Sequence, residues 1–162
     1  MNENLKRVAQ RINDELHALQ DVVNRTQKAF ELAKKNPTEA DFYLDSVALN
    51  LHDFYTGIER VMEVIGANID NFIPEGKHWH SELLKQMSQE NQDVRPAVFL
   101  QSTRNFLDEY LRFRHVVRNL YSFDFDINRM KHLVERLNEV FDQIKKELVA
   151  FAQFIEEIRK KE

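Results

Sequence analysis

Apolar residues recur at alternating steps of three and four positions along most of the chain, which is the spacing of one face of an α-helix. The pattern covers residues 4–35, 38–66, 97–121 and 126–158, and a shorter helical stretch covers residues 78–87. In the second of these stretches the apolar positions are Leu44, Val47, Leu51, Phe54, Ile58, Val61 and Ile65. The sequence therefore predicts four long helices and one short helix.

Polar residues, glycine and proline indicate where these helices begin and end. Thr38, followed by an acid three positions later, predicts a capping-box start for the second helix, and Gly66 predicts its end. Asp126 predicts an N-cap for the last helix, after a turn at residues 122–125. Gly57 lies inside the second helix, where glycine costs about 1 kcal/mol relative to alanine. Gly57 indicates either that a neighbouring helix or aromatic ring approaches closely, or that the helix simply tolerates the cost of a glycine.

The composition favours an all-α fold. The 162 residues include three Gly and three Pro, whereas Leu, Glu, Lys, Arg, Gln and Ala are plentiful. Such a composition is typical of long helices with few turns. We therefore expect a single domain over residues 1–162, folded as an antiparallel bundle of four long helices plus one short helix.

Several functional classes are excluded by what the sequence lacks. There is no cysteine, which rules out disulfides, thiolate catalysis and Cys-ligated metal centres. No run of about 18 apolar residues is long enough to span a membrane. The N-terminus is polar and acidic, unlike a signal sequence. We therefore expect a soluble, cytoplasmic protein that does not associate with a membrane.

The charge is unevenly distributed. The net charge of −4 argues against a general DNA-coating protein, which would need many Lys and Arg side chains facing phosphates. The stretch from Arg95 to Tyr121, however, contains five arginines and only two carboxylates. A basic strip on an otherwise acidic protein can still attract one phosphate-bearing ligand to a particular place.

Two of these arginines fall where a helix should bury apolar side chains. At roughly 100° per residue, Arg114, Arg118 and Tyr121 lie within about 60° of one another. They share the helical stripe of Leu107 and Tyr110. Because an unpaired guanidinium is costly to bury, the stretch must meet an anion, pair with carboxylates, or face another subunit.

The structural interpretation is that these arginines extend their charged ends to solvent and pair with Asp or Glu on the next helix. The functional interpretation is favoured by the buried position of Arg114 and Arg118 and by the adjacent His115, which can exchange protons near neutral pH. Both interpretations are compatible with the residue pattern alone.

Four segments carry a family resemblance. They are LHDFYTGIER at residues 51–60, WHSELL at 79–84, RPAV at 95–98 and FRHVVRNLY at 113–121. Together they resemble HEPN domains, and within them the HepT-like ribonuclease toxins, over residues 38–158. The usual motif of that family is Arg, four to six residues, His, often with Tyr two positions after the His.

In this chain the corresponding pattern is Arg-His-x-x-Arg-Asn-x-Tyr. Arg114 matches the motif arginine, His115 the polar residue that follows it, and Tyr121 the motif tyrosine. Asn119 stands where the motif histidine is expected. An amide can orient an oxygen atom but cannot exchange a proton at neutral pH. Arg118, between these positions, is a further candidate for the site.

The resemblance implies a symmetric homodimer in which the motif helices of two subunits build one shared site. It implies metal-independent RNA cleavage, in which the 2′-hydroxyl of the substrate attacks its own phosphate and no cofactor is needed. Arg114 and Arg118 are then expected to bind phosphate oxygens, because guanidinium groups match them in shape and charge. His115 is a candidate to replace the missing proton-transfer group, although it lies on the flank of the stripe.

Tyr121 has a second implied role. In HepT-like systems a minimal nucleotidyltransferase antitoxin can modify the motif tyrosine with AMP, so the resemblance implies such a partner protein. The structural alternative is a half-buried tyrosine whose hydroxyl is hydrogen-bonded at the helix end. Both roles are compatible with the sequence.

Two residues outside the motif are candidates for supporting it. Glu59 could orient one of the motif arginines, or form a surface pair with a cation on its own helix. His80 is expected at a helix cap or at the edge of the cleft. A metal site at His78 and His80 is not expected, because side chains two positions apart on a helix point about 200° apart.

These observations give two functional hypotheses of different classes. The first is the toxin of a toxin–antitoxin pair, an endoribonuclease acting on RNA at a composite dimer site. The alternative is a noncatalytic HEPN-type bundle that binds RNA or nucleotide, or that serves as the substrate-binding subunit of a minimal nucleotidyltransferase. Asn119 motivates the alternative. In a third, purely structural reading the two arginines are salt-bridged within one chain.

Overall fold

The computed structural model of the protein describes residues 2–119, 121 and 127–161. Its helices are α1 (Asn2–Lys35), α2 (Ala40–Ile65), α3 (Trp79–Met87), α4 (Gln101–Asn119) and α5 (Ile127–Lys161). Within the described residues the backbone forms no β-sheet, only an isolated bridge between Asn91 and Arg95. The predicted all-α fold of four long helices and one short helix is therefore confirmed.

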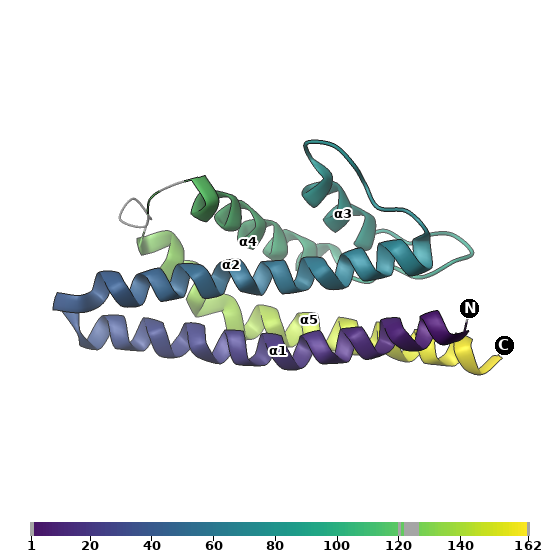
Figure 1. The fold of residues 1–162 in the computed structure, drawn as a ribbon, viewed down its shortest axis with the longest axis horizontal. Helices are drawn as coiled ribbons and strands as arrows, with labels where there is room; N and C mark the ends of the chain where they lie inside the picture. Colours follow the sequence, from purple (N-terminus) through teal and green to yellow (C-terminus); the bar gives the residue numbers. More distant parts are fainter. Residues whose placement is uncertain (1, 120, 122–126, 162) are drawn as a thin grey trace.

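The long helices α1, α2 and α5 form the body of the bundle, with α1 packed against both of the others. α1 and α2 run antiparallel, and α5 returns along α1, so the start of α1 and the end of α5 lie at the same end of the bundle (Figure 1). α4 packs mainly on α2, and α3 contacts both α2 and α4. All five helices and the segment before α4 supply fully buried side chains, which include Ile12, Leu19, Phe54, Ile58, Leu83, Met87, Phe99, Phe113 and Phe141.

At Gly57 the side chains of α1 pack directly against the backbone of α2. A Cβ atom at this position would lie 2.7 Å from Leu19 Cδ2 and 2.8 Å from Glu15 Oε1. Both distances are shorter than real Cβ contacts. The glycine therefore makes room for α1. The first of its two explanations, close approach of a neighbouring helix, is confirmed.

The predicted start of α2 is wrong by two residues. Pro37–Glu39 form a 3₁₀ turn, and α2 begins at Ala40 with no side-chain cap. Proline is well suited to the first position of a helical turn because its φ angle is already helical. Thr38 is thereby drawn into the turn, so it does not cap α2.

The predicted end of α2 at Gly66 is confirmed, since α2 ends at Ile65 and Gly66 is its C-cap. A π turn over Gly66–Asp70, which the sequence did not predict, follows α2 and ends at Asn71, whose left-handed conformation has φ = 52°. Gly66 is needed for space, since a Cβ there would lie 2.9 Å from the carbonyl oxygen of Phe72. The wider π turn places Asp70 at the base of the loop that leads to α3.

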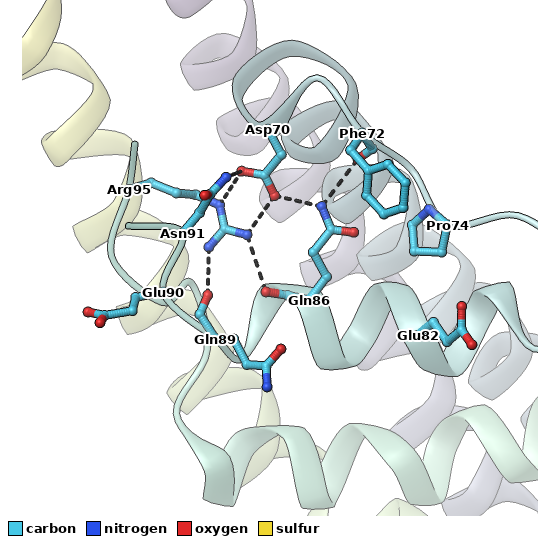
Figure 2. A pocket seen from close by; sticks show the side chains of 9 residues that line it. All are labelled: Asp70, Phe72, Pro74, Glu82, Gln86, Gln89, Glu90, Asn91 and Arg95. Carbon is cyan, nitrogen blue, oxygen red and sulfur yellow. Dashed lines mark hydrogen bonds and ion pairs between the residues drawn. The ribbon is translucent and has the colours of Figure 1, made fainter. Parts of the chain in front are cut away.

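Asp70 is bound there by Arg95, whose guanidinium donates to both carboxylate oxygens at 2.7 and 2.6 Å (Figure 2). Arg95 also donates to the backbone carbonyls of Gln86, Gln89 and Pro96. Burial alone would raise the pKa of Asp70, but hydrogen bonds from Arg95 and Gln86 hold it below its usual range. Arg95 is therefore a structural cation and does not belong to a basic strip.

The start of α4 is set by a carboxylate from α5. Helix geometry begins at Gln101, four residues later than predicted, because the backbone bends at Val98 and Phe99, whose amides both donate to the carbonyl of Met87. Glu147 accepts hydrogen bonds from the Leu100 amide and the Thr103 hydroxyl, each at 2.6 Å. A side chain distant in sequence thus caps α4.

The end of α4 falls at Asn119, so Tyr121 lies beyond the helix in which the sequence placed it. The predicted turn at residues 122–125 and the N-cap at Asp126 lie outside the described residues. α5 is described from Ile127 onward.

Candidate functional site

Arg114 lies on the side of α4 that faces α2. Its Nη1 donates to Glu59 Oε1 at 2.8 Å, and its Nη2 donates to Glu59 Oε2 at 3.2 Å. The side chains are 5% and 6% exposed. The guanidinium also lies over the ring of Tyr55, 4.9 Å from its centre. Arg114 is therefore a buried cation with a carboxylate and an aromatic ring as partners.

This pairing explains why a cation is tolerated on a buried stripe. Two opposite charges that share two hydrogen bonds offset much of the cost of leaving water. An arginine over an aromatic face gains a further attraction from the electrons of the ring. The pair joins α2 to α4, and it orients both side chains in one geometry.

His80, in the first turn of α3, is the third member of the cluster. Its Nδ1 lies 2.7 Å from Glu59 Oε2 and 2.9 Å from Arg114 Nη2. An ionised carboxylate only accepts hydrogen bonds, and a guanidinium only donates them. The shortest contact therefore assigns the proton of Nδ1 to Glu59. Arg114 and His80 then share Glu59 as their acceptor.

Two neighbouring groups have raised pKa values. Burial raises the pKa of Tyr55, and the negative charge of Glu59 adds to this effect, while Arg114 opposes it. The Tyr55 hydroxyl is buried and has no hydrogen-bond partner in the described structure. On the next turn of α2, burial and the charge of Glu59 raise the pKa of Glu63, against the opposing charges of His80 and Arg114.

Beside this cluster, the surface is hollowed between the start of α3 and α4. This α3–α4 hollow has a volume of about 510 Å³, and its lining includes His80, His115, Lys77, Arg112 and Arg129. One carboxylate, Asp108, also lines it and pairs with Arg112. Among the residues that the structure describes, its lining therefore includes three basic side chains, one carboxylate and the imidazoles of His78, His80 and His115.

The rest of the predicted site lies on the surface. Arg118 and Asn119 are exposed in the last turn of α4, and the Asn119 amide donates to the carbonyl of His115 at 2.7 Å. Tyr121 is 74% exposed. The expectation that Arg118 and Tyr121 share the buried stripe with Arg114 is wrong, because the end of α4 rises away from α2 (Figure 1).

The structure thus divides the predicted residues into two groups. Glu59, His80 and Arg114 form one buried cluster, and His115 shares the hollow with His80. Arg118, Asn119 and Tyr121 lie farther along the chain, on the surface of the isolated subunit.

The cluster and the hollow include residues outside the predicted site, among them Tyr55, Lys77, Arg112 and Arg129. Tyr55 precedes Glu59 by one helical turn, and that spacing could have identified it as a neighbour. Lys77 and Arg129 carry no such signal, because they reach the hollow from segments far apart in sequence.

Among the side chains that the structure describes, no group of three or more His, Asp or Glu could hold a metal ion. None of the helices, over their described residues, is long and apolar enough to cross a membrane.

An all-helical bundle whose fourth helix carries the Arg-His pair, followed by the motif tyrosine, has the features of a HEPN domain. The family model described as "HepT-like protein" matches residues 46–155, which include α3, α4 and most of α2 and α5. The chain therefore belongs to the HepT-like family, a toxin-type group within the HEPN superfamily. No curated protein and no solved structure matches the chain.

Proposed function

We propose that this protein is the toxin of a toxin–antitoxin pair, a metal-independent endoribonuclease whose site is completed by a second copy of the chain. Family membership supports the class. The observation that carries the proposal is the buried Glu59–Arg114 pair, which holds His80 at the edge of a basic hollow.

The reaction needs positive charge near the phosphate and groups that exchange protons. The charge comes from the exposed Arg118 and from the cations of the α3–α4 hollow. Arg114 donates to Glu59 from within the bundle, so it acts as a positioning residue. His115 is an exposed imidazole in the same hollow and is available for proton exchange.

The homodimer forms through α4 in this proposal. Val116 and Arg118 lie on parts of α4 that are half-buried or exposed in one subunit. Pairing two such helices would bury the apolar side chains and bring two basic surfaces to one RNA strand. A symmetric arrangement would also place Arg118 of each copy beside the other.

Tyr121 is the proposed point of regulation by a minimal nucleotidyltransferase antitoxin. Its side chain is 74% exposed and lies just beyond the helix, within reach of a modifying enzyme. Attached AMP would add negative charge and bulk beside the basic surface, which would repel RNA phosphate.

The Arg118→Ala variant tests the proposal. Arg118 is exposed, so its loss leaves the fold intact, and we expect RNA cleavage to fall by roughly ten-fold to a hundred-fold. Arg25, exposed on α1, supplies the matched control Arg25→Ala, which keeps wild-type activity. Equal cleavage by both variants would remove Arg118 from the site.

Asn119 favours a second candidate function, namely RNA or nucleotide binding without turnover, or service as the substrate-binding subunit of a nucleotidyltransferase. The Asn119 amide is bonded back to its own helix and cannot exchange a proton. This candidate predicts binding of RNA by a wild-type protein that leaves it intact. An Asn119→His change would then create cleavage.

A further inference from the structure

We infer that the α3–α4 hollow binds the scissile phosphodiester of RNA and that His80 is the catalytic residue that takes the proton from the attacking 2′-hydroxyl. This inference rests on the proposed ribonuclease function and names the group that replaces the missing motif histidine. It assigns the proton transfer to α3, outside the motif helix.

The position of His80 is fixed by three neighbours. Its Nδ1 is bonded to Glu59, which is itself held by two hydrogen bonds from Arg114. The ring of Trp79 lies against the imidazole, with their centres 3.7 Å apart. A histidine oriented by a buried carboxylate keeps one tautomer and one ring direction.

The other ring nitrogen of His80 is the one available for chemistry. With the proton of the neutral imidazole on Nδ1, Nε2 carries a lone pair and can accept a proton. No described residue makes a hydrogen bond to Nε2. The His80 side chain is 28% exposed and lines the hollow, so a ligand there can reach it. Nε2 is therefore placed to act as a general base.

The hollow has the charge and size that a phosphodiester requires. Lys77, Arg112 and Arg129 reach its lining from three separate segments, and Asp108 is the carboxylate among the described residues that line it. Its volume of about 510 Å³ falls in the range of small-ligand sites, about 300–1,000 Å³. The cations would attract the phosphate and stabilise the negative charge that develops on its oxygens.

The proposed step balances without metal or cofactor. The 2′-hydroxyl transfers its proton to His80 Nε2, and its oxygen forms a bond to phosphorus. The bond from phosphorus to the 5′-oxygen breaks, and that oxygen takes a proton from protonated His115 across the hollow. The products are a 2′,3′-cyclic phosphate and a 5′-hydroxyl.

The rate should depend on pH, because His80 must be neutral and His115 protonated when RNA binds. The charged groups that face His80 are Lys77 from the segment before α3, Glu59 and Glu63 from α2, Asp108, Arg112 and Arg114 from α4, and Arg129 from α5.

The His80→Gln variant tests the inference. We expect its cleavage rate, measured in a single turnover, to fall by about 10²–10⁴ and to lose its decline at low pH. Added imidazole should restore part of the activity to His80→Ala. Loss of the decline at low pH and rescue by imidazole are not expected for a residue that has only a structural role. His17, exposed on α1, supplies the control His17→Gln, whose rate and pH profile stay those of the wild type.

A His80→Gln rate within about two-fold of wild type, with the same pH profile, would overturn the inference and leave the ribonuclease proposal standing. A wild-type protein that leaves RNA intact would overturn the proposed function and, with it, the proton-transfer step. Binding of RNA then tests whether the α3–α4 hollow is a phosphodiester site. A fully 2′-O-methylated RNA oligonucleotide should shift the imidazole NMR signals of His80 and His115 but not His17, and unchanged signals would overturn the binding site.

Discussion

At the scale of single residues, the burial of the Arg114 guanidinium determines how the side chains of the site are arranged. The guanidinium is turned toward α2, where Glu59 and Tyr55 surround it. Because Glu59 also binds His80, the same carboxylate joins three helices. The Glu59–Arg114 pair therefore holds the helices together and also orients His80 in the proposed catalytic geometry.

The Glu59→Gln variant should be strongly destabilised. It keeps the shape of the side chain but leaves Arg114 buried without a counter-charge, which typically costs about 3–5 kcal/mol. Urea unfolding followed by circular dichroism would measure the loss. Glu135→Gln, which alters an exposed pair with Lys131 on α5, should leave the free energy of unfolding nearly unchanged. Similar midpoints for both variants would contradict the buried ion pair.

The sequence could predict this cluster only in part. A cation on an apolar stripe must have a partner, and Glu59 was a candidate because of its place on α2. The assignment of His80 as third member could not follow from periodicity, because it depends on how α3 docks against α2 and α4. The same docking creates the α3–α4 hollow, so the cations that line the hollow could not be predicted from the sequence.

At the scale of elements, side chains distant in sequence move the helix boundaries. The apolar pattern predicts all five helices, since each one has to bury a stripe. The π turn after α2 and the late start of α4 escaped prediction. They depend on Asp70 meeting Arg95 and on Glu147 reaching the start of α4, and neither partner is a local signal.

The Asp70–Arg95 pair predicts a pH dependence of stability. The pKa of Asp70 is lower in the folded protein than the ordinary value of 3.8, so the unfolded chain binds the proton first. The contribution of the pair to the free energy of unfolding is complete above a pH of about 3.8. This contribution is lost as the pH falls through the lower pKa that Asp70 has in the folded protein.

The Asp70→Asn variant lacks this contribution at every pH. The difference in unfolding free energy between wild type and Asp70→Asn should therefore shrink as the pH is lowered from about 6 to about 3. Thermal or urea unfolding at several pH values measures this difference. A gap that stays constant or widens in acid would contradict the role of the carboxylate.

At the scale of the whole molecule, the account requires two copies of the chain. Light scattering should give twice the mass of one chain, 19.4 kDa. Val116→Glu, on a half-buried position of α4, should shift the protein to the monomer. Val149→Glu, at an exposed position of α5, is the control and should stay dimeric. A monomeric wild-type protein would contradict the composite site.

The central claim is that the chain cleaves RNA without metal, and analysis of the RNA ends tests it most directly. Purified wild-type protein is incubated with single-stranded RNA and excess chelator, and the new termini are identified by mass spectrometry. The account predicts fragments ending in 2′,3′-cyclic phosphate and beginning with a 5′-hydroxyl. Intact RNA, or fragments that begin with a 5′-phosphate, would contradict it.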